Sequence, residues 1–356
     1  MARIQIGVIG LGGVCQGGHL PAIERSKDLQ LTAICDIDRD KLQVVGERYG
    51  IGEERRFTDY RDLIACADVQ AVDIATPNNW HYPIAMDAAA AGKPFSVEKP
   101  ITMNAEEAQR LAARVREKNL KSMVCFSYRF QKAARMARDL VSQGLLGDLY
   151  HANMQYFQAW GLPDWNAPLV WRLRKEIAAS GALGDLGCHA IDLVRFVTQK
   201  EYLKVVADAD TFVRERPLPE GGGTGKVDVD DYCNYLARME GGLSASFLIT
   251  RFAFGRGNYQ RLELYGSKGS LVYTLDAGPN ESPISVCFGQ PMGTLKVFTP
   301  LPVPAKYEMD QMQSFADMIL EKGDGLSATA EDGLMNQKVV DAVLNSFEQE
   351  KWMTIS

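Results

Sequence analysis

What this 356-residue sequence has little of narrows its function before any motif is considered. It has only four histidines, at positions 19, 81, 151 and 189, so a histidine acid–base catalyst must be one of these. It has no block of lysine and arginine, and its net charge is −6. That balance argues against nucleic acid or an anionic membrane as a partner.

Paired cysteines and long apolar runs are also missing. The seven cysteines include no C-x-x-C pair and no Cys/His cluster with zinc spacing, so we expect free thiols in a reducing cytoplasm and no metal site. No apolar run approaches the length of a membrane span, and the start Met1-Ala-Arg-Ile does not resemble a signal peptide. A composition of 46% hydrophobic residues is typical of a globular protein, and the length predicts two domains.

The first third of the chain carries a strand, a glycine turn and a helix in direct succession. The apolar run 3–9 leads into Gly10-Leu-Gly-Gly-Val-Cys15, and a helical stretch covers residues 19–25. Gly10 permits a tight turn, and Gly12 lets the backbone approach a pyrophosphate at the helix N-terminus. This context predicts a dinucleotide site. The turn residues expected to bind the cofactor are Gly10, Gly12, Gly13 and Val14.

The second predicted strand, 29–35, ends in a carboxylate. Asp36 lies about 20 residues past the turn, where an acidic side chain binds the ribose hydroxyls of the adenosine. A carboxylate there repels a 2′-phosphate, so we expect NAD rather than NADP.

Strands and helices keep alternating up to residue 125, which predicts a parallel sheet with ligand groups beyond the carboxyl ends of its strands. Strands are expected at 69–75, 93–97 and 122–126. Lys99 reads either as a surface lysine before a proline turn or, as we favour, as a group at the mouth of the nucleotide crevice. The other residues expected there are Thr76, Pro77, Asn78, His81 and Glu98.

The pattern changes past residue 130. A helix at 131–143 and a strand at 149–158 precede six strand-like runs between 203 and 288, which predict one large, mainly antiparallel sheet. We therefore expect an α/β protein with a Rossmann dinucleotide-binding domain over 1–125. A second α/β domain for substrate binding and oligomerisation would cover 126–356, with the last helices able to pack back toward the first domain. A sheet with helices on one face favours a homodimer or homotetramer through the other.

The segment Gly181–Asp192 concentrates polar residues in a glycine-rich stretch. Asp185, His189 and Asp192 are spaced by four and three, so a helix would project them from one face, with Gly181 and Gly184 allowing close approach. It reads either as an acid–base site or as a plain helix entry with a buried histidine.

Tryptophans lie just upstream of this segment. Trp160 and Trp171, with Arg172 beside the second, either stack on sugar faces or belong to the core. The glycine-rich loop 217–226 reads equally as a lid or an inert hairpin tip.

Together these motifs resemble the glucose–fructose oxidoreductase and inositol dehydrogenase family (Gfo/Idh/MocA), over nearly the whole chain. A Glu-Lys-Pro motif followed about ninety residues later by Gly-Asp-x-Gly-x-His-x-x-Asp is specific to that family. Trp171-Arg172 resembles its inositol and anhydrosugar dehydrogenase branch. The matching stretches are Gly10–Gly13, Ala75–Asn78, Glu98–Pro100, Gly181–Asp192, Glu263–Gly269 and the last helices.

The resemblance implies an NAD-dependent oxidoreductase that transfers a hydride between nicotinamide and a secondary hydroxyl of a sugar, inositol or anhydrosugar. It implies that Lys99, Asp185 and His189 are the catalytic residues. His189, with a reference pKa near 6.5, would take the hydroxyl proton, and Lys99 would stabilise the oxygen. Tyr128 and Arg129 are expected near the nicotinamide. The expected substrate-binding residues are Lys99, Tyr128, Trp160, Trp171, Arg172, Asp185 and His189.

Two alternatives remain open on the same residues. One is an NAD-dependent glycosidase that oxidises its substrate transiently. The other is a non-catalytic NAD-binding subunit, against which the presence of all three catalytic residues argues.

Overall fold

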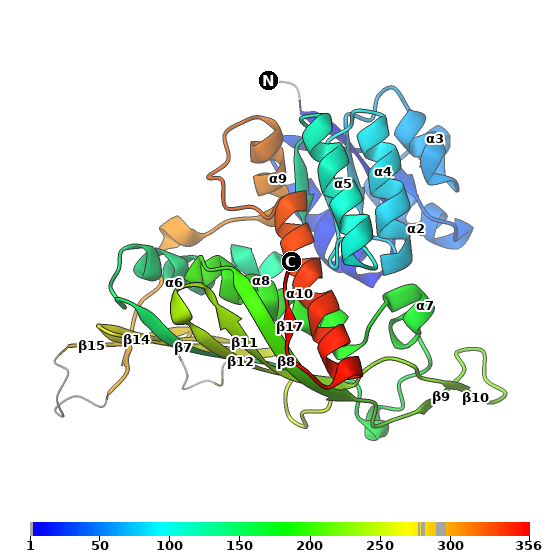
Figure 1. Cartoon of the computed structure of the whole chain (residues 1–356). Helices are drawn as coiled ribbons and strands as arrows, with labels where there is room; N and C mark the ends of the chain where they lie inside the picture. The colour runs from blue at the N-terminus through cyan, green and yellow to red at the C-terminus, as the bar shows by residue number, and fades with distance from the viewer. Residues whose placement is uncertain (1–2, 277, 279–281, 290–296) are drawn as a thin grey trace. The chain divides into compact units, whose positions relative to one another are not determined.

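The structure is a computed structural model that describes residues 3–276, 278, 282–289 and 297–356. The chain divides into two compact units, coloured by residue number in Figure 1. Unit 1 comprises Met1–Ser127 and Met309–Gln337, and unit 2 comprises Tyr128–Glu308 and Lys338–Ser356.

Unit 1 contains the predicted parallel sheet, with six strands in the order β3-β2-β1-β4-β5-β6. The central strands are buried almost throughout, as expected where helices cover both faces of a sheet. The short β3 was not predicted, because a two-residue strand leaves no periodicity to detect. The bounds are β1 Ile4–Ile9, β2 Leu29–Cys35, β3 Arg56–Phe57, β4 Ala71–Ile74, β5 Phe95–Val97 and β6 Ser122–Val124.

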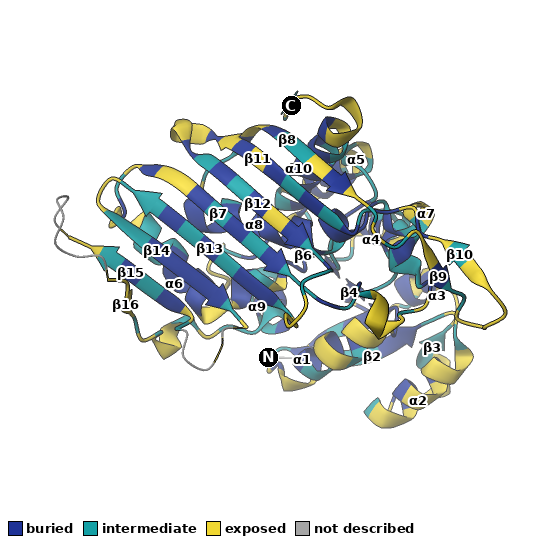
Figure 2. Cartoon of the chain, turned by 90° about the horizontal axis from the view of Figure 1, so that it is seen from below, coloured by how far each residue is buried: buried dark blue, intermediate teal, exposed yellow. Residues whose placement is uncertain are grey.

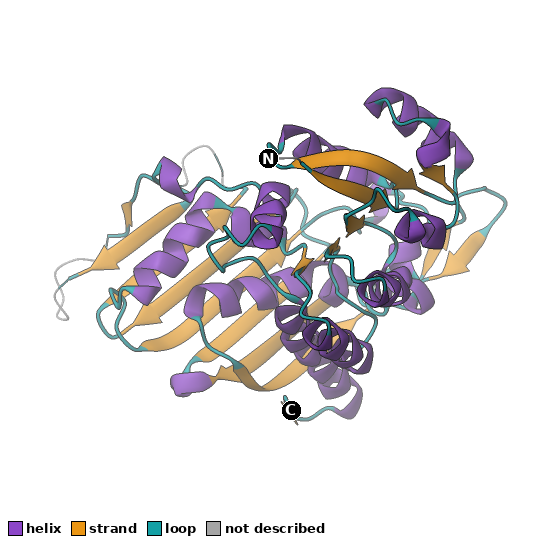
Figure 3. Ribbon diagram, turned by 90° about the horizontal axis from the view of Figure 1, so that it is seen from above, coloured by secondary structure: helices purple, strands orange, loops and turns teal. Residues whose placement is uncertain are grey.

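Helices lie on both sides of this sheet (Figure 3). Their starts follow capping side chains: Asp38 accepts backbone N–H bonds at the start of α2, and Asn104 does so for α5. Gly50 ends α2 in the left-handed region. The helices of unit 1 are α1 Leu20–Arg25, α2 Arg39–Tyr49, α3 Tyr60–Ala65, α4 His81–Ala90, α5 Ala105–Glu117 and α9 Gln311–Ile319. Helix α10, Ala330–Gln349, belongs to unit 1 up to Gln337 and to unit 2 from Lys338.

Unit 2 is built on a nine-stranded sheet in the order β16-β15-β14-β13-β7-β12-β11-β8-β17. The sheet is mainly antiparallel, as expected, but β7 and β12 pair in parallel. A separate hairpin, β9 Glu215–Pro217 and β10 Thr224–Lys226, holds the glycine-rich loop. The remaining strands are β7 Leu149–Phe157, β8 Tyr202–Asp210, β11 Tyr232–Met239, β12 Ser244–Thr250, β13 Tyr259–Gly266, β14 Gly269–Leu275, β15 Ile284–Phe288, β16 Thr299–Pro300 and β17 Met353–Thr354.

One face of this sheet is covered by α6, Lys132–Ser142, and α8, Cys188–Thr198, while the other face is turned to the viewer in Figure 2. Side chains alternate accordingly, as in β7, where Ala152, Met154 and Tyr156 are buried between more exposed neighbours. The uncovered face carries the exposed Leu236 and Leu248.

One stretch of the described chain, Lys175–Thr198, is long and apolar enough for a membrane span by length and composition alone. Of its most apolar window, 83% is buried inside the structure, as is usual for a core helix.

Candidate active site

The glycine turn of unit 1 has the form that the sequence predicts. Gly10 has φ +92°, and a Cβ there would lie 2.7 Å from the Ala75 backbone, so a larger residue is excluded. A Cβ on Gly12 or Gly13 would meet nothing within 4 Å, which leaves the turn open to a ligand. The next residues, Cys15–His19, form a π-helical turn that the sequence pattern did not reveal.

Asp36 holds this turn in place. Its Oδ2 accepts a hydrogen bond of 2.7 Å from the Leu11 N–H, and its Oδ1 accepts one of 2.9 Å from the Asp38 N–H. The carboxylate therefore stands at the end of β2 beside an open glycine turn. These residues fit a dinucleotide, whose pyrophosphate needs the turn and whose ribose needs the acid.

The loop after β4 is fastened by His81, which is fully buried. Its Nδ1 lies 2.7 Å from the Pro100 carbonyl oxygen and its Nε2 lies 2.9 Å from that of Thr76. Burial lowers the pKa of His81 more than the two carbonyl acceptors raise it, which favours a neutral ring. A neutral ring has one N–H, so it donates to one of these carbonyl oxygens while its other nitrogen faces the second, and both contacts shape the Thr76-Pro77-Asn78 loop.

Glu98 and Lys99 follow β5 directly, in a group that sequence reasoning missed. The His19 ring lies between Asp73 and Glu98, with Nδ1 2.8 Å from Asp73 Oδ2 and Nε2 3.0 Å from Glu98 Oε1. The Ser96 hydroxyl donates to Asp73 Oδ1 at 2.6 Å. We name His19, Asp73, Ser96 and Glu98 the carboxylate–histidine cluster. The sequence feature that could have indicated this cluster was Asp73, a single acidic residue within an apolar strand.

In unit 2 the segment Gly181–Asp192 begins with a π-helical turn, Leu183–Gly187, before α8. Gly181 is required by the chain itself and not by a ligand, since a Cβ there would lie 1.8 Å from the Asp230 carbonyl oxygen. The Asp230 carboxylate accepts hydrogen bonds from the Gly181 and Leu183 N–H groups, which fixes the start of the turn.

Asp185 is held by an arginine that the sequence did not single out. Arg251, whose side chain is 1% exposed, donates to Asp185 Oδ2 at 3.2 Å and to the Gly181 carbonyl at 2.8 Å. Its guanidinium also lies 4.6 Å from the ring centre of Trp160. Arg172 Nε lies 3.8 Å from Asp185 Oδ1 and stacks on Trp171. Asp185, Trp160 and Arg172, three of the residues expected to bind substrate, are thus close together, and their role in substrate binding stays a prediction.

His189 lies against tyrosine rings. Its ring centre is 4.6 Å from that of Tyr128, edge to face, and 6.4 Å from that of Tyr156. The two tyrosine hydroxyls are 2.5 Å apart, and Asn258 Oδ1 accepts from Tyr156 at 2.7 Å and from Gln158 at 2.9 Å. We name Tyr128, Tyr156, Gln158 and Asn258 the tyrosine–amide cluster.

The tyrosine–amide cluster is neutral and largely unforeseen. Burial, with the neighbouring Tyr128 as a smaller cause, raises the pKa of Tyr156, so its hydroxyl keeps its proton. Of the four residues only Tyr128 was predicted, because Tyr156 lies on β7, Gln158 directly follows it, and Asn258 lies in the loop before β13. Trp160 Nε1 donates to Gln158 Oε1 at 2.9 Å, which joins the predicted tryptophan to the cluster.

Arg129 was expected to bind the cofactor, but its side chain is buried in unit 2. Its Nε and Nη2 donate to the two Asp192 carboxylate oxygens at 2.8 and 2.6 Å. Both side chains are at most 5% exposed. The pair ties α8 to the segment after β6, and cofactor binding by Arg129 stays a prediction.

Family models match both parts of this chain. An oxidoreductase family model with an NAD-binding Rossmann fold matches residues 4–126, and a Gfo/Idh/MocA C-terminal domain model matches residues 134–272. The chain belongs to the Gfo/Idh/MocA family. As a member of this family it is an oxidoreductase, and its Rossmann domain binds NAD.

Relatives of this Gfo/Idh/MocA protein include several sugar and polyol enzymes. A levoglucosan dehydrogenase from Pseudarthrobacter phenanthrenivorans is 33% identical over 85% of this chain and 84% of its own length. An inositol 2-dehydrogenase from Rhizobium meliloti is 25% identical over 99% of both chains. A solved levoglucosan dehydrogenase in complex with NADH and L-sorbose has a TM-score of 0.87 and 30% identity, and covers all of both chains.

Proposed function

We propose that this Gfo/Idh/MocA protein oxidises or reduces a secondary hydroxyl of a sugar, inositol or anhydrosugar, with NAD as cofactor. The observation that carries the proposal is the arrangement around Asp185 and His189 in unit 2. Fixed charges on one side and a neutral tyrosine–amide cluster on the other suit a ligand rich in hydroxyl groups. Levoglucosan, the substrate that names one relative, is an anhydrosugar, and inositol names another.

His189 is proposed to accept the proton of the reacting hydroxyl. Its imidazole is held by edge contact with Tyr128, so the ring is oriented without a further charge from that side. Lys99 is proposed to donate a hydrogen bond to the same oxygen and stabilise its developing negative charge. Bound NAD supplies the hydride acceptor in the oxidative direction.

Asp185 is proposed to orient the substrate. Arg251 and Arg172 lie against its carboxylate, and a carboxylate accepts hydrogen bonds from hydroxyl groups. Trp160 and Trp171, each half-buried, would offer faces for a sugar ring. Neither a glycosidase nor a non-catalytic subunit is favoured by the named relatives.

A screen of inositols, aldoses and anhydrosugars at fixed NAD tests the proposal, with absorbance of the reduced cofactor as the readout. We expect turnover with at least one of these classes and product of unchanged carbon skeleton. Release of a free leaving-group sugar with no net NADH would contradict it in favour of a glycosidase.

We also propose that the protein is a homo-oligomer through the uncovered face of the unit 2 sheet, and that it is cytoplasmic. The exposed Leu236 and Leu248 on that face, and seven cysteines that are all free thiols, support these two proposals. Light scattering should show a dimer or tetramer, and Leu248→Arg should shift it toward the 39.4 kDa monomer. A monomeric unmodified protein at micromolar concentration would contradict the proposed homo-oligomer.

A further inference from the structure

A buried group of ionisable side chains in unit 1 has no part in the proposed chemistry. His19 is 4% exposed and Asp73 is fully buried. Both oxygens of the Glu98 carboxylate are engaged: Oε1 faces His19 Nε2 at 3.0 Å, and Oε2 accepts from the Lys99 N–H at 3.2 Å. Burying two carboxylates and an imidazole is costly unless their charges compensate one another, so the protonation of this group matters.

The charged groups on both sides of the ring determine its proton count. Ionised carboxylates only accept hydrogen bonds, so a ring that bonds to one on each side must carry a proton on both nitrogens. Burial alone would lower the pKa of His19, but the charges and hydrogen bonds of Asp73 and Glu98 raise it well above its ordinary value. His19 is therefore an imidazolium at neutral pH.

The other groups that face His19 are compatible with this charge. Burial raises the pKa of the Cys15 thiol, with Asp73, Asp36 and Glu98 adding to the effect. Burial likewise raises the pKa of the Cys125 thiol, helped by Glu98 and Asp73. Both thiols stay neutral, and the Ser96 hydroxyl donates to Asp73. The oxygens that face the ring are Asp73 Oδ2 and Glu98 Oε1, while Ser96 donates to the other Asp73 oxygen.

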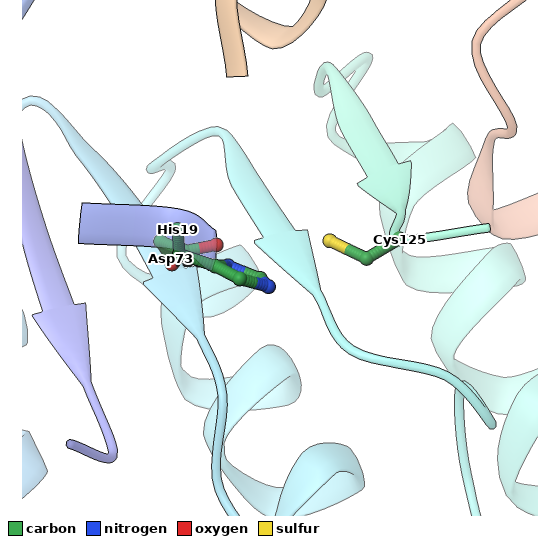
Figure 4. A group of neighbouring side chains, drawn as sticks. All are labelled: His19, Asp73 and Cys125. Atoms are coloured by element: carbon green, nitrogen blue, oxygen red, sulfur yellow. Dashed lines mark hydrogen bonds and ion pairs between the residues drawn. The ribbon is translucent and has the colours of Figure 1, made fainter. Parts of the chain in front are cut away.

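The same place also brings together three potential metal ligands. One ligand atom each from His19, Asp73 and Cys125 lies within 4.8 Å of the others, and the three side chains are drawn in Figure 4. A metal needs a ring nitrogen lone pair and a thiolate. Here both ring nitrogens point at carboxylate oxygens and the thiol is protonated, so the geometry favours a proton over a metal.

We propose that His19 is a positioning residue: held between two carboxylates, it fixes the Glu98 side chain and thereby the backbone of Lys99, and it ties that segment to the glycine turn. His19 ends the π-helical turn that follows the glycines, and Glu98 opens the Glu-Lys-Pro segment. A cofactor-binding element and a catalytic element thus share one buried proton-bearing ring.

His81 provides the matched comparison. It holds the same segment from the other end, through the Pro100 carbonyl, but its acceptors are neutral and its ring carries no such compensation. Lys99 is therefore bracketed by a charged histidine on one side and a neutral one on the other.

Nitrogen NMR of ¹⁵N-histidine-labelled full-length protein tests the charge directly, since the chain has only four histidines. We expect one ring whose two nitrogens both stay protonated at pH values above the reference pKa of 6.5. His19→Gln should remove that signal, and His81→Gln should remove a neutral ring instead. If His19→Gln does not fold, the signal is assigned by elimination with His81→Gln, His151→Gln and His189→Gln.

A second variant tests the cause. Glu98→Gln keeps the side-chain shape and removes one negative charge, so the His19 signal should titrate at a lower pH. A His19 ring that is neutral near pH 7 in the unmodified protein overturns the proposal. So does stoichiometric zinc in the purified protein that is lost in Cys125→Ser.

The kinetic measurement on His19→Gln rests on the proposed role of Lys99, whereas the NMR measurement does not. A failure of the proposed function would therefore change only the kinetic result, and a neutral His19 would change the NMR result. His19→Gln should lower kcat about ten- to a hundredfold, because Lys99 loses its tether, with the substrate KM changed less than about threefold. A purely packing role predicts a lower melting temperature with kcat per folded molecule unchanged, and that result overturns the positioning role.

Discussion

The two units organise polar side chains in opposite ways. The carboxylate–histidine cluster of unit 1 is ionic and closed, with each oxygen of Asp73 and Glu98 already engaged. The tyrosine–amide cluster of unit 2 is neutral, and Tyr128 and Gln158 are only half-buried. Hydroxyl and amide groups both donate and accept, whereas a carboxylate only accepts.

This difference separates two tasks of a dehydrogenase. The ionic cluster has one favourable arrangement, so it suits a scaffold that must hold Lys99 and the cofactor turn in one geometry. The neutral cluster can re-pair its protons around different hydroxyl patterns, so it suits recognition of a polyol. His19 and His189 are the same residue type in these two settings, and the neighbours determine what each can do.

The largest effect is expected when the proposed catalytic side chain of either unit is removed, His189 in unit 2 or Lys99 in unit 1. His189→Ala should lower kcat at least about a hundredfold, because general acid–base groups contribute that much, and Lys99→Ala should cost a comparable amount. NAD affinity should change far less in both. The double variant should lose much less than the product of the two single losses, since both groups are proposed to serve one proton transfer.

His151→Ala is the matched control, because this histidine is exposed on β7. It should leave kcat unchanged. A folded His189→Ala protein with near-normal turnover would show that His189 is an ordinary buried residue.

The second test breaks the buried ion pair between Arg251 and Asp185 in the unit 2 site. Arg251→Met should destabilise the fold by about 3 kcal/mol, because Asp185 and the Gly181 carbonyl lose a buried donor. Arg214→Met removes an exposed pair with Asp210 and should cost under about 1 kcal/mol. Urea unfolding of the two variants measures the contrast, and equal costs would refute a structural role for the buried pair.

These residues also show where sequence reasoning succeeds and where it stops. The glycine turn, Asp36 and the Glu-Lys-Pro segment were predictable because each follows a strand, and parallel strands bring their carboxyl ends together. Arg251 and Asn258 were not, because long-range pairing in a mixed sheet places them by register, which no local pattern encodes. The two π-helical turns escaped as well, since periodicity arguments assume 3.6 residues per turn.

The pairing of buried charged side chains is the other feature that the sequence alone does not predict. The sequence shows His19 at a helix start and Asp73 inside a strand, but only the fold reveals that Glu98 completes their pairing. For Arg129 a nearby motif suggested a cofactor contact, and the fold reveals in addition that its guanidinium pairs with Asp192, 63 residues on.

A third, smaller effect is expected at the cofactor turn of unit 1. Asp36→Ser removes the charge that repels a 2′-phosphate and should narrow the NAD over NADP preference in kcat/KM by roughly tenfold. The serine also loses one of two backbone contacts, so NAD affinity should fall slightly. Asp38→Ser, which keeps a helix cap, should leave cofactor preference unchanged. Equal use of both cofactors by the unmodified protein would contradict this role of Asp36.

The smallest effect separates two buried tyrosines of unit 2. Tyr156 donates to Asn258 at 2.7 Å, so Tyr156→Phe should lower stability by about 1 kcal/mol and raise the substrate KM severalfold. The Tyr273 hydroxyl is also buried, and it has no hydrogen-bond partner among the residues that the structure describes. Because an unpaired buried hydroxyl is unfavourable, Tyr273→Phe should leave the melting temperature unchanged or raise it.

The pair discriminates because the same atom is deleted from the same residue type on two strands of one sheet, β7 and β14, which are separated by β13. If the tyrosine–amide cluster recognises substrate, only Tyr156→Phe should alter KM, and kcat should stay within about threefold, since neither hydroxyl is proposed to touch the reacting proton. Thermal melts and substrate titrations of both variants give the answer. Equal KM values in the two variants would mean that the tyrosine–amide cluster supports the fold of unit 2 and that other residues bind the substrate hydroxyls.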